Sequence, residues 1–486
     1  MSVISHNETK NGPKKAEEKP SLYASHIKVY PQRIAGTFRR IKWLTLYTLL
    51  GLYYLVPWIR WDRGPGAPSQ AVLIDMPARR AYFFGIEIWP QEVYYLAGIL
   101  ILGAIGLFLA TGLAGRVWCG FTCPQTVWTD LFMWVERKIE GSRNKRMKLD
   151  AGPLTLEKAA KKISKHAAWI VISIITGGAW IFYYGDAPTM LKEMLTGQAS
   201  QTVYGFLFLF TATTYLLAGW AREQVCTYMC PWPRFQSAMF DEDTLIVTYE
   251  AWRGEPRGKA KTDDKIGDCV DCNLCQNVCP TGVDIRKGSQ LECIGCALCI
   301  DACNSVMTKL NRPLNLITYD SISNQNARQE GKPERIRLIR PRTVAYMALL
   351  TIVGGIMAYG LLERPRVEVN IQRDRSPLFV TLSNGDIRNG YTFKILNMLR
   401  RERTFNLTTE YVDNATMTVI GINGRDRKNV TLKVGPDTVG TYRVFVKAPP
   451  QSLKAESQNL EFVLRETGAQ SHVEVDSTTK FYGPKK

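Results

Sequence analysis

The sequence predicts a multi-domain membrane protein. It would contain an α-helical bundle of five spans, a small α+β domain and a C-terminal all-β immunoglobulin-like sandwich. Three observations predict this fold class: five long apolar stretches, eight of the twelve cysteines within 35 residues, and a C-terminal series of short alternating segments. The chain has 486 residues and a net charge of +18, although 45% of its residues are hydrophobic. Its length allows several domains, and its charge must be unevenly placed.

The N-terminal residues 1–36 are predicted to be a disordered cytoplasmic tail. The first thirty are polar, with Lys, Glu, Asn and Pro throughout. They show no short apolar core followed by a small-residue cleavage site, so we expect no cleaved signal peptide.

Five stretches are apolar enough to cross a bilayer, which takes about 20 residues of helix. They are residues 43–59, 93–114, 167–184, 199–221 and 343–362. Buried helices of a soluble core are the alternative, but five such runs flanked by Trp, Tyr and Arg match the chemistry of a membrane interface. Residues 37–240 are therefore predicted as a four-span membrane domain, and residues 341–363 as a fifth transmembrane helix.

The charges between the spans predict the orientation. The 115–166 loop holds eleven Lys and Arg residues, whereas the 185–198 loop holds only Lys192. By the positive-inside rule, the N-terminus, the 115–166 loop and residues 222–342 are cytoplasmic, and five spans place residues 364–486 outside. We expect a multi-pass protein of the bacterial inner (cytoplasmic) membrane with a periplasmic C-terminal domain. The basic charge is explained by this topology, so no nucleic-acid partner is expected.

The predicted cytoplasmic domain, residues 241–340, contains the spacing C-x2-C-x2-C-x3-C twice. This pattern is typical of ferredoxins with two [4Fe–4S] clusters, in which the fourth cysteine of each run serves the other cluster. One cluster is predicted at Cys269, Cys272, Cys275 and Cys303, and the other at Cys293, Cys296, Cys299 and Cys279. Disulfides suit small secreted domains, and zinc sites usually show cysteine pairs, so both alternatives are weaker.

A second set of thiols follows the second and fourth predicted spans. Each time an Arg precedes C-x3-C-P, which gives Cys119 and Cys123, then Cys226 and Cys230. Cysteines four apart share one face of a helix and could chelate a metal, and two hairpins related by a pseudo-twofold axis would bring the pairs together. Soft thiolates select Cu(I), Zn or Fe–S, and Arg116 and Arg222 are expected to lower the thiol pKa values. The alternative is that these cysteines are small apolar packing residues.

The C-terminal residues 364–486 predict an immunoglobulin-like sandwich. Seven short strands are expected at 367–371, 378–382, 404–408, 415–420, 430–434, 441–446 and 460–464, with Asn-Gly, Gly-Pro-Asp and Pro-Pro turns between them. This part has no cysteine and no catalytic constellation.

Other candidates are weaker. Met190 and Met194 could be thioether copper ligands, although packing is the simpler interpretation, and His166 is expected at a membrane interface. The chain shows no nicotinamide, flavin or c-type haem motif, so electrons must come from another protein or from quinol.

The order of these parts resembles the CcoG/FixG/RdxA family, the accessory proteins of cbb(3)-type cytochrome c oxidase. The stretches 389–391 and 394–397 also resemble that family's outer domain. The membrane half is similar to NapH-type ferredoxin proteins, which lack an outer sandwich. The first resemblance implies a metalloreductase that converts Cu(II) to Cu(I) on the cytoplasmic side for assembly of the oxidase. In that role Cys119, Cys123, Cys226 and Cys230 would bind copper and act as the catalytic residues.

The implied partners are oxidase assembly factors or a copper chaperone, with an electron donor that the sequence does not identify. A homodimer is compatible with this interpretation, and no residue pattern requires one. Two other functions stay open: a NapH-like electron conduit between quinol and a redox partner, and an oxidase assembly scaffold with structural clusters.

Overall fold

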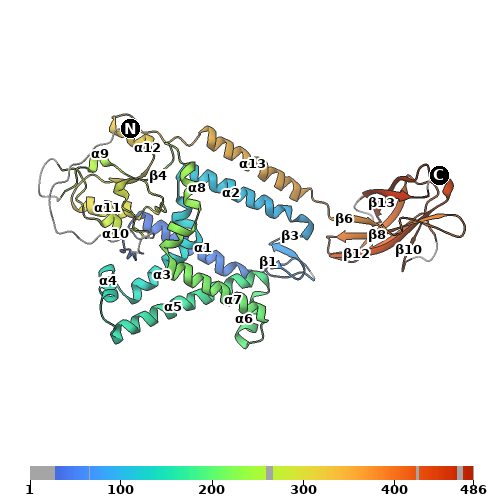
Figure 1. Ribbon diagram of the computed structural model, residues 1–486, viewed down its shortest axis with the longest axis horizontal. Coiled ribbons are helices and arrows are strands. Elements are labelled where there is room, and N and C mark those ends of the chain that lie inside the picture. Colours follow the sequence, from blue (N-terminus) through green and yellow to red (C-terminus); the bar gives the residue numbers. More distant parts are fainter. Residues whose placement is uncertain (1–27, 65, 259–265, 423–425, 468–473, 485–486) are drawn as a thin grey trace, which may run out of the picture. The chain divides into compact units, whose positions relative to one another are not determined.

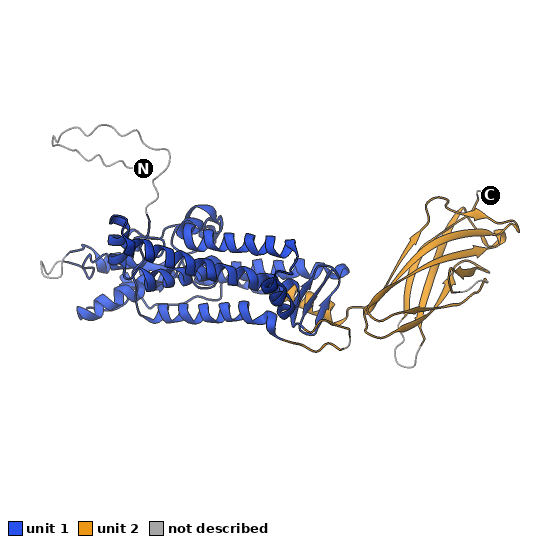
Figure 2. Cartoon of the chain, turned by 90° about the horizontal axis from the view of Figure 1, so that it is seen from below, with its two compact units in different colours: residues 1–59, 70–350 blue, residues 60–69, 351–486 orange. Residues whose placement is uncertain are grey.

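A computed structural model describes residues 28–64, 66–258, 266–422, 426–467 and 474–484 (Figure 1). The chain forms two compact units, one within residues 1–59 and 70–350 and the other within residues 60–69 and 351–486 (Figure 2).

Among the described residues, four helical segments are long and apolar enough to cross a membrane. They are Pro90–Ala114, Leu156–Tyr184, Gln201–Ala221 and Pro341–Leu362. The corresponding helices are α2 (Tyr94–Ala114), α5 (Leu156–Ile181), α7 (Gln201–Thr214) with the π-helical turn η5 (Tyr215–Ala221), and α13 (Pro341–Leu362). Four of the five predicted spans are confirmed as helices of sufficient length and apolarity, which supports a membrane protein.

The remaining predicted span, residues 43–59, is not among these four segments. It falls in helix α1 (Thr37–Leu55) and the short turn η1 (Val56–Trp58). Two of its polar side chains bond to α5: Tyr53 donates to the Thr176 carbonyl, and the Tyr54 hydroxyl lies 2.8 Å from Thr176 Oγ1. α1 therefore lies against a candidate span. Its tyrosines lower its mean hydropathy, which is the property by which candidate spans are recognised.

Shorter elements join these helices. They are the three-stranded sheet β1 (Val72–Asp75), β2 (Arg80–Phe83) and β3 (Ile86–Ile88), and helices α3 (Pro124–Ile139), α4 (Arg143–Ala151), α6 (Ala187–Thr196) and α8 (Trp232–Met239). This sheet was not predicted from the sequence. Buried Gln70 fixes its start, because its amide nitrogen donates to the Phe182 carbonyl and its amide oxygen accepts from the Ala187 N–H.

The cysteine-rich part of the first unit is α+β, as predicted. Strands β4 (Ile246–Tyr249) and β5 (Ile317–Asp320) pair antiparallel beside helices α9 (Ala251–Gly254), α10 (Leu274–Val278), α11 (Leu298–Lys309) and α12 (Ile322–Gln329). Their core holds Met307, Leu316 and Ile317, each at most 2% exposed, together with Cys269 and Cys275.

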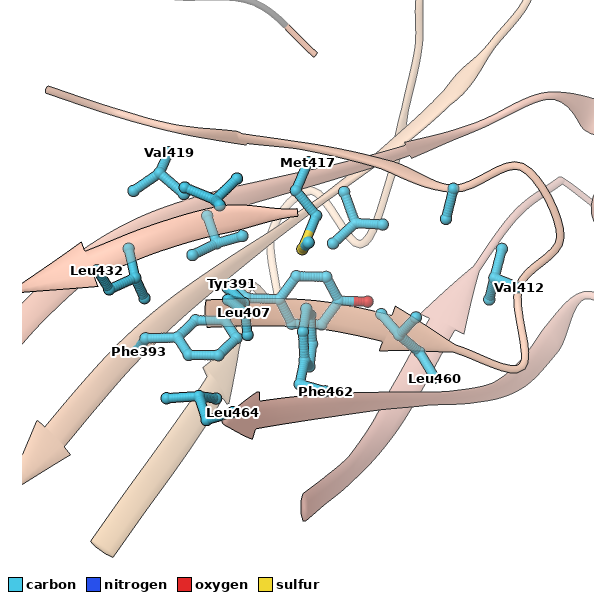
Figure 3. Close-up of a cluster of buried hydrophobic side chains, with 14 of the residues drawn as sticks. Tyr391, Phe393, Leu407, Val412, Met417, Val419, Leu432, Leu460, Phe462 and Leu464 are labelled. Atoms are coloured by element: carbon cyan, nitrogen blue, oxygen red, sulfur yellow. The ribbon is translucent and has the colours of Figure 1, made fainter. Parts of the chain in front are cut away.

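The second unit is a sandwich of two antiparallel sheets. One has the order β10-β12-β8-β6 with β7 on β8, and the other has the order β11-β9-β13-β14. The strands are β6 (Val367–Arg373), β7 (Val380–Thr381), β8 (Ile387–Asn397), β9 (Arg403–Glu410), β10 (Thr416–Val419), β11 (Val430–Val434), β12 (Thr438–Ala448), β13 (Ser457–Glu466) and β14 (Glu474–Tyr482). Tyr391 and Phe393 of β8 meet Phe462 of β13 edge to face, with ring centroids 5.1 and 4.7 Å apart (Figure 3).

All seven predicted strands contribute to this sandwich, but β8 and β14 were not predicted. β8 includes Asn389-Gly390, a pair that usually indicates a turn. Here the fully buried Asn389 amide donates to the Tyr482 carbonyl and accepts from the Tyr482 N–H, which ties β8 to β14. A Cβ at Gly390 would collide with the Asp374 carboxylate, so a larger residue there would displace that side chain.

Candidate functional site

Four of the predicted ligands line one cavity with an empty volume of about 350 Å³. They are Cys269, Cys272, Cys275 and Cys303. Cys275 lies on α10 and Cys303 on α11, while the other two lie on the loop before α10. The structure therefore brings together the four cysteines that the 2-2-3 spacing assigns to one cluster.

The other four, Cys279, Cys293, Cys296 and Cys299, line a second cavity, which Cys275 also lines and whose empty volume is about 350 Å³ including the solvent at its mouth. The two halves share a local geometry. Asn273 and Ala297, each directly after the second cysteine of its run, adopt left-handed backbone with φ of 55° and 58° and begin α10 and α11. The repeat seen in the spacing is thus also a repeat of backbone conformation.

The donor chemistry of both cavities fits iron–sulfur clusters. Burial raises the pKa of the Cys275 thiol to about 11 and the pKa values of Cys293 and Cys303 to about 12. Such thiols lose their protons near neutral pH only when a cation takes the proton's place. Cluster iron, which binds thiolates, is such a cation.

The two C-x3-C-P motifs also repeat in their backbone. The π-helical turns η3 (Trp118–Thr122) and η6 (Val225–Met229) carry Cys119 and Cys226. Each turn ends when the next cysteine donates its N–H five residues back, Cys123 to Trp118 and Cys230 to Val225, both at 2.8 Å. The second cysteine of each pair leaves the turn with non-helical backbone before α3 or α8 begins, so the two cysteines of a pair do not share one face of a regular α-helix.

These four thiols are nevertheless neighbours. The pKa of the Cys226 thiol is raised to about 12, chiefly by burial and in addition by the nearby Cys123, Cys119 and Cys230. Cys119 and Cys226 both pack against the apolar cluster of Ile294, Cys296 and Leu298. Within the described ranges, however, no three His, Cys, Asp or Glu side chains are gathered around a single-ion site.

The net pKa values of the Cys119 and Cys226 thiols are raised, although the arginines were expected to lower them. Arg116 does lower the pKa of Cys119, but burial outweighs it and raises that pKa to about 12. Arg222 points elsewhere, because its guanidinium pairs with Glu136 at 3.0 Å.

The first C-x3-C turn is in direct contact with the loop of the second cavity. A Cβ on Gly120 would lie 2.9 Å from the Cys296 Cα, and a Cβ on Gly295 would lie 3.0 Å from the Arg116 Cβ. The Arg116 guanidinium donates to the Cys293 carbonyl at 2.7 Å. Sequence reasoning missed these two glycines, although each stands beside a predicted ligand.

A second contact joins the cysteine-rich part to α1. The Asp301 carboxylate accepts hydrogen bonds from the backbone N–H groups of Phe38 and Arg39, at 3.2 and 2.8 Å. The Arg39 guanidinium donates to both carboxylate oxygens of Asp130 on α3. Asp301 stands between Cys299 and Cys303 on α11, so this contact holds the helix that carries one cysteine of each cavity against α1.

The weaker candidates lie apart from these cysteines in the chain. The Met190 sulfur packs against Gly185, and the Met194 carbonyl accepts from the Tyr204 hydroxyl at 3.0 Å. Their role as copper ligands stays a prediction. His166 Nδ1 lies 2.8 Å from the Tyr215 hydroxyl, so this ring is bonded within the helices.

Three family models match the chain. Residues 221–322 match a 4Fe-4S dicluster domain, residues 96–141 match a 4Fe-4S binding domain, and residues 357–484 match the IG-like fold at the C-terminal of FixG. The 96–141 match includes Cys119 and Cys123 and none of the ferredoxin cysteines. The chain is thus an iron–sulfur protein with membrane helices and an immunoglobulin-like domain.

Curated relatives agree with these matches. The chain is 50% identical to nitrogen fixation protein FixG of Rhizobium meliloti over 88% of each chain. It is 47% identical to protein RdxA of Cereibacter sphaeroides over 89% of this chain and 91% of that protein. The ferredoxin-type protein NapH of Haemophilus influenzae is 25% identical over 44% of this chain and 68% of its own length. The identity and coverage of the first two relatives show that the chain belongs to the FixG/RdxA family.

Proposed function

We propose that this chain is an electron-transfer oxidoreductase that reduces Cu(II) to Cu(I) on the cytoplasmic side of the bacterial inner membrane. The contact of Gly120 with Gly295 and Cys296 carries the proposal. It places the turn of Cys119 against a loop whose cysteines line the second cavity. A thiol pair is thereby held beside an iron–sulfur domain with no side chain between the two backbones.

Two [4Fe–4S] clusters would be held by the cysteines of the two cavities. When bound, they would supply one-electron carriers. The protein's own contribution is to bury the ligands and fix the segments that carry them: Arg116, just after α2, holds the loop of Cys293, and Asp301 holds α11 to α1. A fixed loop keeps the distance between the cavities and the four outer thiols constant.

Copper would bind as the substrate at Cys119, Cys123, Cys226 and Cys230. Cys230 is exposed and the other three are half-buried, so an ion can enter from the Cys230 side. Soft thiolates bind Cu(I) in preference to harder ions, which favours reduction of the bound ion. The 96–141 match supports a competing assignment, in which Cys119 and Cys123 hold iron instead.

We further propose that α1 completes a five-span topology. Its bonds from Tyr53 and Tyr54 to Thr176 place it beside α5, and its N-terminal end meets the cysteine-rich part at Asp301. With α1 as a span, the N-terminus, the 115–166 loop and the clusters are cytoplasmic and the C-terminal sandwich is periplasmic, as the charge distribution favours. Oxidase assembly factors or a copper chaperone are the proposed recipients of Cu(I).

The likeness to NapH over part of the membrane and cysteine-rich region favours a second candidate function. In it, the chain conducts electrons between quinol and a redox partner. Reduction of the clusters by a quinol analogue would support this function, and the absence of copper reduction would leave it as the better proposal.

The variant Gly120→Val tests the contact that carries the main proposal. A side chain at this position must push Gly295 and Cys296 away, because their backbone atoms lie 2.9 Å from the Cβ position. We expect the rate of Cu(II) reduction by the chemically reduced protein to fall at least about tenfold, since a displacement of about 1 Å can cost about 100-fold.

The matched control is Gly106→Val in α2, where a Cβ meets nothing within 4 Å. It should reduce Cu(II) at the wild-type rate. Equal rates in both variants, with equal iron content, would show that the contact plays no part in the reaction.

A further inference from the structure

A cavity outside the cysteine sites lies between the first half of α5 and the end of η5. Its empty volume is about 840 Å³, including the solvent at its mouth. Its lining residues include Lys28, Lys162, Lys165, His166, Trp169 and Arg222. We propose that this cavity binds the phosphate headgroup of an anionic phospholipid.

The ion pairs around the cavity have a net positive charge that one anion would balance. Three carboxylates are each shared by two cations: Asp150 by Lys28 and Lys162, Glu140 by Lys162 and Lys165, and Glu136 by Arg146 and Arg222. The four lining cations and Arg146, which lies outside the lining, thus meet these three carboxylates, and Glu223 of the lining brings the count to five cations and four carboxylates. A phosphate diester carries the single negative charge that would balance them.

The cationic groups are held in place before any ligand arrives. The side chains of Lys165 and Arg222 are 4% and 8% exposed, and both cations lie over the ring of Trp169, at 4.7 and 5.3 Å from its centroid. The ammonium group of Lys165 also pairs with Glu140, and the guanidinium of Arg222 also pairs with Glu136. A phosphate entering the cavity would therefore meet oriented donors and would not have to order long surface side chains.

The position of the cavity fits a lipid. It lies where the candidate span Leu156–Tyr184 begins and the candidate span Gln201–Ala221 ends. Trp220 at its rim is 73% exposed, as is typical of a side chain at a bilayer interface. Leu216 and Ile163 nearby in the chain are 49% and 69% exposed and offer apolar surface for acyl chains. Basic pockets between membrane helices on the cytoplasmic side commonly bind anionic headgroups.

A neutral quinol fits less well. His166, the side chain best suited to accept a quinol proton, is already bonded through Nδ1 to the Tyr215 hydroxyl. The excess of cations favours an anion over a neutral ring. Because Arg222 stands four residues before Cys226, a bound headgroup would also hold the loop that carries the second C-x3-C turn. This inference does not depend on copper chemistry.

The test is native mass spectrometry of the delipidated full-length protein, titrated with dioleoylphosphatidylglycerol. The double variant Lys28→Gln, Lys162→Gln should weaken binding about 30-fold, since each cation near a lipid surface contributes about 1 kcal/mol. The matched control is Lys148→Gln, Lys161→Gln, which removes the same charge from the same region without touching the lining. It should change binding less than about twofold.

Further arms separate the ligands. Dioleoylphosphatidylcholine should bind at least about tenfold more weakly, because its headgroup has no net charge to balance the excess cation. Equal binding of the two lipids, or equal losses in both double variants, would overturn the proposal. So would displacement of phosphatidylglycerol by decylubiquinone or by millimolar inorganic phosphate, which would assign the cavity to a quinone or to a free anion.

If the double variant does not fold, brominated phosphatidylglycerol replaces it as the test. It should quench wild-type tryptophan fluorescence more than that of Trp220→Phe, and equal quenching would overturn the assignment.

Discussion

Replacing Cys119, Cys123, Cys226 and Cys230 together with Ser is expected to lower the rate of Cu(II) reduction at least about 100-fold. Loss of residues that only orient a metal ligand already costs about 10–100-fold, and here the ligands themselves are removed. A hydroxyl is a harder and far less acidic donor than a thiol, so the preference for Cu(I) is lost with the sulfur. The measurement is the rate of Cu(I) formation by protein reduced chemically and freed of excess reductant.

The iron content and the visible absorbance of the fourfold variant should equal those of the wild type. The eight ferredoxin cysteines are untouched and line their own two cavities. A control with Thr122→Ser and Thr227→Ser changes the same two turns without removing sulfur. A fall in iron content would contradict the assignment, because it would show that the four thiols hold iron, as the 96–141 match allows.

Glu136→Gln is expected to destabilise the folded protein by about 3–5 kcal/mol, the usual cost of removing one partner from a buried ion pair. Glu136 is fully buried and lies 3.2 Å from Arg146 and 3.0 Å from Arg222. Burial alone would raise the pKa of the Glu136 carboxyl, but Arg222, Arg146 and Lys165 outweigh it and hold the pKa below its usual range. The neutral amide leaves these cations without their counter-charge.

The change can be measured by denaturant unfolding in detergent micelles, with Glu157→Gln as the matched control. Glu157 forms an ion pair with Lys161 in the next turn of the same helix and is exposed, so its loss should leave the unfolding midpoint unchanged. The wild-type carboxylate stabilises fully above about pH 4.3, the unfolded pKa of Glu, and its contribution is lost as the pH falls through the lowered folded pKa. The difference between wild type and Glu136→Gln should therefore shrink only in acid. A variant as stable as the control would show that the arginines find other partners.

The ligand spacing could be predicted from the sequence because it is local. In each run the first two cysteines lie on a loop and the third lies on the helix that follows, while the fourth ligand comes from the other run: Cys303 on α11 for one set and Cys279 at the end of α10 for the other. The structure gathers the same two sets around two cavities. The spans were predictable for a similar reason, since apolarity over one helix needs no knowledge of its neighbours.

Contacts between distant segments could not be predicted. Gly120 and Gly295 are separated by 175 positions. Nothing in the sequence around either glycine indicates that the two backbones are in contact. In the sequence, Asp301 is simply a polar residue within a ferredoxin motif. In the structure, its carboxylate accepts hydrogen bonds from the Phe38 and Arg39 N–H groups in the first turn of α1. The strand of Asn389 was missed because a buried amide that bonds a neighbouring strand has the same sequence pattern as a turn.

The most direct test of the copper site is X-ray absorption at the copper edge of the protein after it has reduced one equivalent of Cu(II). We expect Cu(I) with sulfur as its nearest ligands, and loss of those sulfur contacts in the fourfold Ser variant. A shell of nitrogen and oxygen that is the same in the wild type and the variant would contradict the assignment of copper to these thiols.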